Sequence, residues 1–175
     1  MNLFLIGYRG SGKSTVAARL AEIVGWPWLD ADAVLEERAG RTIKQIFADG
    51  GEAAFRDLEA AVLADLAAGD RRILALGGGA ILREANRRIL AQRGFTVWLR
   101  AAPEVLHERI HADPLTGERR PNLTGMGGLD EIRTLLAQRT PLYEACAQWS
   151  VAADTASAEE IAHRIAAALR ERKLA

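Results

Sequence analysis

The chain has 175 residues, 49% of them hydrophobic, which is enough for one domain with a buried core. Its 23 Lys and Arg residues balance its 23 Asp and Glu residues. A net charge of zero argues against nucleic-acid binding driven by bulk charge. Together with the lack of an evident exposed apolar stripe, it leads us to expect a monomer. The single cysteine, Cys146, has no partner for an internal disulfide, so we interpret it as a buried apolar side chain.

No stretch of the sequence is long and apolar enough to cross a membrane, so we expect no membrane partner. The N-terminal apolar run is too short for a signal peptide and leads directly into a glycine-rich loop. We therefore expect a cytoplasmic protein.

Predicted strands and helices alternate along the chain. The apolar patterns predict strands at 2–6, 26–30, 72–76, 95–99 and 149–152. They predict helices at 16–24, 34–39, 43–47, 53–67, at 82–92 with Gly94 closing it, from Pro103 onward, at 129–147 with a kink or restart at Pro141, and at 158–172. The alternation indicates an α/β fold of three layers, in which helices cover both faces of a five-stranded parallel sheet. Ligands of such sheets bind beyond the carboxyl ends of the strands.

The loop at 7–15, G-Y-R-G-S-G-K-S-T, follows the first strand, precedes a helix and fits the pattern G-x-x-x-x-G-K-[ST]. Its glycines allow backbone N–H groups to surround an anion, and the helix start adds its positive dipole end. Lys13 can reach the β- and γ-phosphates of a nucleotide, and the Ser14 hydroxyl can bind Mg²⁺. The loop predicts a nucleoside triphosphate but leaves the second substrate open.

Two carboxylates, Asp30 and Asp32, follow the second strand at a spacing that lets both face the same way. One can hold Mg²⁺ through water, and the other can accept a proton from a hydroxyl or orient it. The alternative is that Asp32 only caps a helix starting at Ala33. The third strand ends at three glycines, 77–79, and carries no acid, which favours Asp30 for the metal.

Arginines stand at three further places. Arg56 and Glu59 share a helical face, and Arg56 suits a carboxylate, although a surface ion pair is the alternative. A stretch at 113–128 is predicted to be a mobile lid that brings Arg119 or Arg120 over the phosphates, and a solvated basic loop is the alternative. Arg139 lies on the helix that follows the lid.

Taken together and in their order along the chain, these motifs resemble those of the shikimate kinase family. They are the short phosphate loop, D-A-D after the second strand, F-R-x-x-E, G-G-G, R-P in the lid and R-x-P-L-Y, and they span nearly the whole chain. The resemblance implies a P-loop fold of the nucleoside-monophosphate-kinase type with strand order 2-3-1-4-5. It also implies phosphorylation of the 3-hydroxyl of shikimate by ATP and Mg²⁺, in the route to chorismate and the aromatic amino acids.

The resemblance also assigns roles to individual residues of one domain over 1–175. It implies catalytic roles for Lys13, Asp32 and Arg120, and a metal site at Ser14 and, through water, Asp30. ATP would contact Gly10, Ser11, Gly12, Lys13, Ser14, Thr15, Arg109 and Arg120. Shikimate would contact a segment at about 31–60 and, in all, Asp32, Phe47, Phe55, Arg56, Gly77, Gly78, Gly79 and Arg139. The lid reads R-P-N-L after an inserted-looking D-P-L-T-G-E, so the choice between Arg119 and Arg120 stays open.

Two other functions fit the phosphate loop. Another small-metabolite kinase on the same scaffold, such as a gluconate kinase, would share the loop but would have no reason to pair Arg56 with Arg139. A nucleotide-dependent switch without a phosphorylated substrate would hydrolyse ATP slowly, whatever small acid is added.

Overall fold

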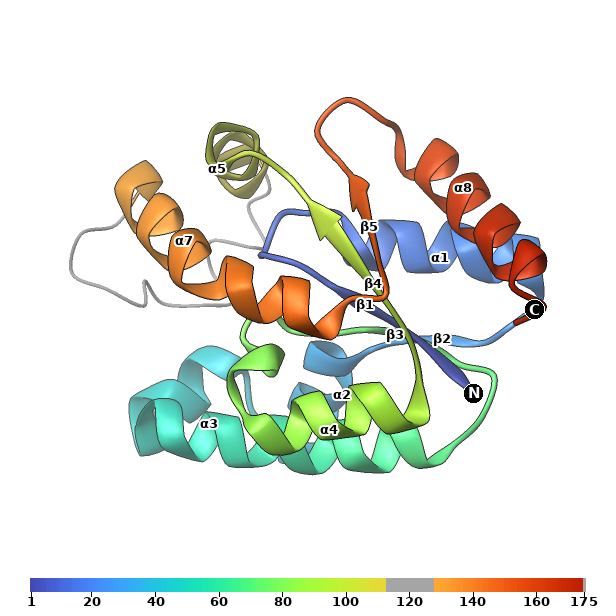
Figure 1. Ribbon diagram of the computed structural model, residues 1–175. Coiled ribbons are helices and arrows are strands. Elements are labelled where there is room, and N and C mark those ends of the chain that lie inside the picture. Colours follow the sequence, from blue (N-terminus) through green and yellow to red (C-terminus); the bar gives the residue numbers. More distant parts are fainter. Residues whose placement is uncertain (113–127, 175) are drawn as a thin grey trace.

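The structure is a computed structural model that describes residues 1–112 and 128–174. Its sheet consists of β1 (Asn2–Ile6), β2 (Trp28–Asp30), β3 (Ile73–Ala75), β4 (Gly94–Arg100) and β5 (Trp149–Ala152). Every neighbouring pair is parallel, and the order is β2-β3-β1-β4-β5 (Figure 1). The predicted α/β class and strand order are confirmed.

The helices are α1 (Lys13–Val24), α2 (Ala31–Ala39), α3 (Ile43–Ala68), η1 (Ala80–Leu82), α4 (Glu84–Arg93), α5 (Pro103–Ala112), α7 (Gly128–Cys146) and α8 (Ala158–Glu171). Figure 1 shows α1 and α8 on one side of the sheet and α3 and α4 on the other. The central strand β1 is buried along its whole length, as expected of a strand covered on both faces.

Alternation along β1 divides the core between the two faces. Leu3 and Leu5 pack with Leu20 of α1 and Ile165 of α8, whereas Phe4 packs with residues of α3, α4 and α7. Successive side chains of a strand point to opposite faces, so a single strand joins both apolar layers. Packing on both faces therefore holds the carboxyl end of β1, and the loop that follows it, in place.

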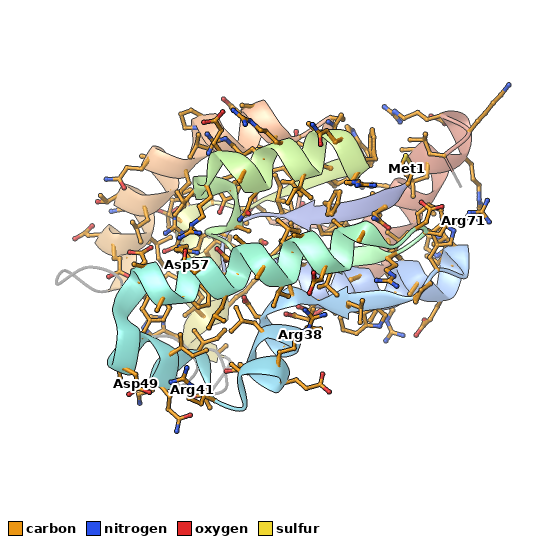
Figure 2. The ribbon with its side chains drawn as sticks, turned by 90° about the horizontal axis from the view of Figure 1, so that it is seen from below. Met1, Arg38, Arg41, Asp49, Asp57 and Arg71 are labelled. Carbon is orange, nitrogen blue, oxygen red and sulfur yellow. The ribbon has the colours of Figure 1, made fainter. Side chains whose placement is uncertain are left out.

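The long helix α3 is bent at Gly51, whose φ of 69° and ψ of −171° are not helical. A left-handed φ of this kind favours glycine, and the predicted break between two helical segments is confirmed. Figure 2 shows the outer surface of this helix, where Asp57 lies on the second helical segment. Asp49 lies on the first segment and forms an ion pair of 3.0 Å with Arg41.

Three other predictions have different outcomes. Cys146 is buried, as predicted. The helix α7 continues through Pro141 instead of restarting there. Gly94 follows the last residue of α4, as predicted, and it opens β4 with an extended φ of −177°. Among residues 1–112 and 128–174, no helix combines the length and apolarity that a membrane crossing requires.

Candidate active site

A cavity of about 480 Å³ opens beyond the carboxyl ends of β1, β2 and β3. This size is within the usual range for small-molecule sites. The residues that line it come from the phosphate loop and the start of α1, the ends of β2 and β3 with the turn after β3, helices α2 and α5, the first residue of α3, and the segment from β5 into α8. They are Arg9, Gly10, Gly12, Lys13, Ser14, Thr15, Asp30, Asp32, Glu36, Ile43, Ala75, Leu76, Gly77, Gly78, Arg109, Ala156 and Ala158.

The phosphate loop curls around the Lys13 ammonium group. Nζ of Lys13 donates hydrogen bonds of 2.9 Å to the carbonyl oxygens of Gly7 and Tyr8. Gly12, directly before α1, has a left-handed φ of 87°, a conformation that glycine adopts without strain. Ser11 is buried and, unlike Gly10 and Gly12, does not line the cavity. The loop therefore places one ammonium group and the N-terminus of α1 at the cavity, which suits a polyphosphate.

Asp30 connects two elements of the site. Oδ2 of Asp30 accepts a hydrogen bond of 2.5 Å from the Ser14 hydroxyl, and Oδ1 accepts from the backbone N–H groups of Asp32 and Ala33 at 3.0 and 3.3 Å. The N-cap of α2 is thus Asp30, and the alternative that Asp32 caps a helix starting at Ala33 is wrong. The reason is that α2 begins at Ala31, earlier than its apolar pattern indicated.

Ser14 and Asp30 fit a magnesium site. Both supply oxygen atoms, and they already touch one another at the edge of the cavity. In the part of the chain that the structure describes, no three His, Cys, Asp or Glu side chains form a group able to hold a metal. Mg²⁺ commonly takes only one or two protein oxygens and completes its shell with water and phosphate oxygens. A two-residue set therefore suits it.

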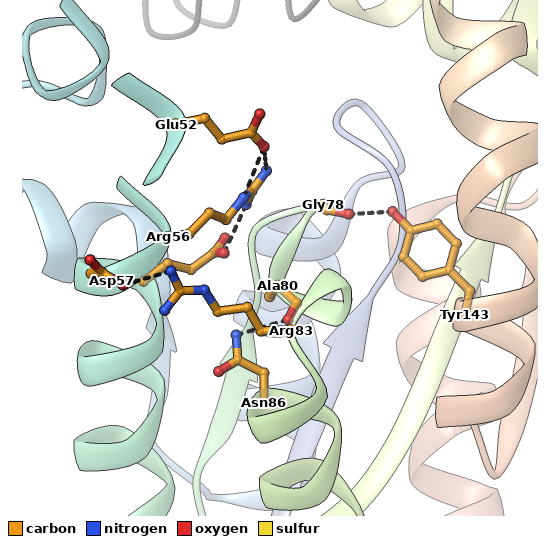
Figure 3. Close-up of polar contacts among 9 residues, drawn as sticks. Glu52, Arg56, Asp57, Gly78, Ala80, Arg83, Asn86 and Tyr143 are labelled. Carbon is orange, nitrogen blue, oxygen red and sulfur yellow. Dashed lines mark hydrogen bonds and ion pairs between the residues drawn. The ribbon is translucent and has the colours of Figure 1, made fainter. Parts of the chain in front are cut away.

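Arg56 is buried between two carboxylates of α3. Its Nη1 donates to Oε2 of Glu59 at 2.8 Å, and Nε and Nη2 both donate to Oε1 of Glu52, at 3.2 and 3.0 Å (Figure 3). The Arg56 and Glu59 side chains are only 8% and 4% exposed, so the alternative of a surface ion pair is wrong. Burial alone would lower the pKa of Arg56, but the charges of Glu59 and Glu52 raise it above its usual value.

The Arg56 side chain packs against the glycine turn 77–79. The end of the Arg56 guanidinium lies so close to Gly79 that a Cβ there would overlap both Nη atoms. The Gly78 carbonyl accepts a hydrogen bond of 2.5 Å from the Tyr143 hydroxyl of α7 (Figure 3). Close approach of the Arg56 side chain therefore explains why position 79 is a glycine.

Arg139 approaches the same turn from α7. It is buried, and its Cζ lies 5.7 Å from the centre of the Tyr8 ring. Tyr143, which binds Gly78, stands four residues later on the same helical face. Tyr8 is itself next to Gly78, because a Cβ on Gly78 would lie 3.5 Å from the Tyr8 Cα. Contacts therefore connect Arg56 and Arg139 through the glycine turn and the phosphate loop.

Tyr8 lies between two guanidinium groups. Burial raises the pKa of its hydroxyl above the usual value, and the charges of Arg9 and Arg139 offset part of that rise. Arg9 lines the cavity and lies 3.7 Å from the buried Glu131 of α7. The sequence reasoning did not select Arg9, because the motif leaves its position free and only the fold shows which way it faces.

The predicted site residues differ in how close they lie to the cavity. Phe47, Phe55, Arg56, Gly79 and Arg139 do not line it. Phe55 is fully buried and packs on Phe47, with ring centres 4.8 Å apart, so these rings form part of the core behind the site. This arrangement supports Arg56 from behind, since Arg56 also stacks over the Phe55 ring at 5.1 Å.

Arg109 of α5 lines the cavity and contacts the segment after β5. Its Nη2 donates to the carbonyl oxygens of Ala153 and Asp154, at 2.8 and 3.3 Å. These carbonyls belong to the segment after β5, where Ala156 also lines the cavity. Residues 113–127 of the predicted lid, with Arg119 and Arg120, lie outside the described residues, and residue 128 begins α7.

Comparisons with known proteins agree on one family. The family model of shikimate kinase matches residues 9–170. The chain is 44% identical to the shikimate kinase of Symbiobacterium thermophilum over 98% of both chains. It is also 44% identical to that of Rhodopirellula baltica, over 91% of this chain and 86% of the relative. Among solved structures, the chain is similar to shikimate kinase from Acinetobacter baumannii in complex with shikimate, with a TM-score of 0.92 and 36% sequence identity. This match covers 99% of the present chain and 95% of the Acinetobacter chain.

A match of this extent covers the phosphate loop, the glycine turn and α7 in a single alignment, and so includes every element that surrounds the cavity. The chain belongs to the shikimate kinase family of ATP-dependent phosphotransferases.

Proposed function

We propose that the chain transfers the γ-phosphoryl group of ATP to the 3-hydroxyl of shikimate. The observation that carries the proposal is the convergence of two kinds of group on one sheet edge. The phosphate loop and Asp30 suit a nucleotide with its metal, and the buried Arg56 and Arg139 flank a glycine turn beside them. Shikimate is a small polyol with one carboxylate, which is complementary to two arginines and an aspartate.

The carboxylate of shikimate is assigned to Arg56 and Arg139. Arginine forms charge-assisted, fork-shaped hydrogen bonds with carboxylates, and these are strong where water is largely excluded. Both residues are 6% exposed, and Glu59 accepts a 2.8 Å hydrogen bond from Arg56. The backbone of Gly78 is assigned to the ring hydroxyls. These contacts would orient the acceptor with its 3-hydroxyl toward the phosphate loop.

Asp32 is assigned to the reacting hydroxyl. It lies in the first turn of α2, where the Asp30 cap fixes the backbone, and it lines the same cavity as Lys13. A carboxylate there can accept the proton of the attacking hydroxyl and hold the oxygen in line with the γ-phosphorus. Phosphoryl transfer needs positioning and charge stabilisation more than covalent help from the protein.

The donor is assigned to the phosphate loop. Lys13 and the loop N–H groups of 10–15 would bind the phosphates, and Arg109 would lie near the adenine. When bound, Mg²⁺ would neutralise charge on the phosphates and fix their position, held by Ser14 and, through water, by Asp30. Arg120 is assigned to the transferring group as part of the lid, and Arg119 is the alternative. Within one domain over 1–175, the segment at about 31–60 would bind the acceptor.

A coupled assay of ADP formation tests the proposal with three parallel samples that contain shikimate, gluconate or no acceptor. We expect ADP formation to require shikimate and Mg²⁺ and to match one phosphorylated product per ADP by mass spectrometry. Stimulation by gluconate without stimulation by shikimate would indicate another small-metabolite kinase. Slow ADP formation that no acceptor changes would indicate a nucleotide switch.

A further inference from the structure

We propose that Glu52 occupies the carboxylate-binding edge of Arg56 before the acceptor arrives, and that the acceptor's carboxylate displaces it. The inference rests on the proposed function, because it requires an acceptor that carries a carboxylate to Arg56. It assigns to Glu52 the role of a competing group that sets the affinity for the acceptor.

The donors of Arg56 leave one edge for an exchangeable carboxylate. A guanidinium carries five N–H donors, and its Nε–Nη2 edge matches a carboxylate in two parallel hydrogen bonds. Nη1 is bound to Glu59, and the end that carries both Nη atoms lies against Gly79. Glu52 holds the Nε–Nη2 edge through both of its hydrogen bonds (Figure 3). An acceptor carboxylate that binds this edge must therefore replace Glu52.

The two carboxylates that bind Arg56 differ in how easily they can leave. Glu59 is only 4% exposed, so separating it from Arg56 would leave a buried charge unpaired at a large cost. Glu52 is 54% exposed and can return to water by rotating its own side chain. Glu52 is therefore the exchangeable partner, and Glu59 is the permanent one.

The backbone around Glu52 also favours such an exchange. Glu52 directly follows Gly51, where α3 changes direction through a non-helical φ. It stands one turn before Arg56, close enough to pair with it without tertiary support from another element. The pairing orients the guanidinium while no acceptor is bound. Because the acceptor has to break this pairing, Glu52 weakens acceptor binding.

Removing the Glu52 charge should then tighten acceptor binding. A half-exposed ion pair contributes only a modest free energy. We therefore expect Glu52→Gln and Glu52→Ala to lower the KM and the calorimetric Kd for shikimate by about two- to fivefold. The kcat and the KM for ATP should remain unchanged, because Glu52 touches neither the phosphate loop nor Asp32 in the described contacts. If Glu52 only positioned Arg56, its substitution would instead raise the KM and the Kd for shikimate.

Asp57→Asn provides the matched control. Asp57 lies on the same helix, is 73% exposed and pairs with Arg83 at 2.6 Å. Its substitution changes the net charge equally but leaves the hydrogen bonds of Arg56 to Glu52 and Glu59 in place. We expect its KM for shikimate to equal that of the wild type. An unchanged or higher KM in Glu52→Gln, or an equal drop in Asp57→Asn, would overturn the inference. Wild-type protein without shikimate-dependent ADP formation would instead refute the proposed function, so the two failures are distinguishable.

Discussion

Ser14 and Asp30 meet at the edge of the sheet, where the Ser14 hydroxyl donates a 2.5 Å hydrogen bond to Oδ2 of Asp30. One comes from the helix of the phosphate loop and the other from the end of β2. The second oxygen of Asp30 caps α2. A single carboxylate thus joins the nucleotide side of the cavity to the helix that carries Asp32, and it supplies the acid that the end of β3 lacks.

The substitution Asp30→Asn separates these two tasks of Asp30. Asparagine caps helices about as well as aspartate, so we expect the melting temperature to change little. The lost negative charge should raise the Mg²⁺ concentration for half-maximal activity by roughly tenfold, the scale seen when groups that support a metal are removed. Magnesium titrations of kcat would show this, and an unchanged titration curve would exclude Asp30 from the metal site.

The substitution Asp32→Asn tests the group assigned to the reacting hydroxyl. An amide keeps the size of the side chain but cannot accept the proton, so we expect kcat to fall by about 10²- to 10⁴-fold. The Kd for ATP should stay near its wild-type value, since Asp32 is not assigned to the nucleotide. Steady-state kinetics and calorimetry with ATP give both numbers. Wild-type turnover in this variant would remove Asp32 from the chemistry.

The substitution Arg139→Ala tests the carboxylate clamp. Loss of a charge-assisted hydrogen bond from a buried arginine should raise the KM for shikimate by about tenfold or more, and kcat should change less because the clamp holds substrate and transition state alike. Arg133→Ala is the control, since Arg133 lies on the same helix but is 53% exposed and pairs with Glu104. Equal KM values for the two variants would show that Arg139 has only a structural role.

The substitution Gly79→Ala tests the contact between the glycine turn and Arg56. The φ of Gly79 is −104°, which alanine adopts readily, so the backbone itself tolerates the change. The added methyl group would overlap the Arg56 guanidinium and force it away from its place. We expect the KM for shikimate to rise by about tenfold while the KM for ATP stays constant. If the KM for shikimate is unchanged, Arg56 does not act from this position.

Local patterns predicted much of the fold and the nucleotide side of the site. The phosphate loop is contiguous, so G-x-x-x-x-G-K-[ST] indicates both the structure around Lys13 and its chemistry. The strands alternate with helices clearly enough to indicate a parallel sheet, whose order came from the family resemblance. Asp30 and Asp32 were found because they end a strand, although only the structure shows that Asp30 is the cap.

The acceptor side required the tertiary structure. Spacing places Arg56 and Glu59 on one helical face but cannot say whether that face is buried, and the exposure of 8% and 4% decides it. Arg9 stands at a free position of the motif, and its approach to the cavity follows from the packing of α7 on the loop. Contacts between segments far apart in the sequence carry no local signal, so the sequence alone did not select Arg9.

The most direct measurement is a crystal structure of the chain with shikimate and ADP. We predict that the shikimate carboxylate lies between Arg56 and Arg139, that the 3-hydroxyl is within hydrogen-bond distance of Asp32, and that the ADP phosphates lie on the loop at 10–15. A shikimate carboxylate bound away from both arginines, or a 3-hydroxyl directed away from Asp32 and the phosphates, would contradict the account.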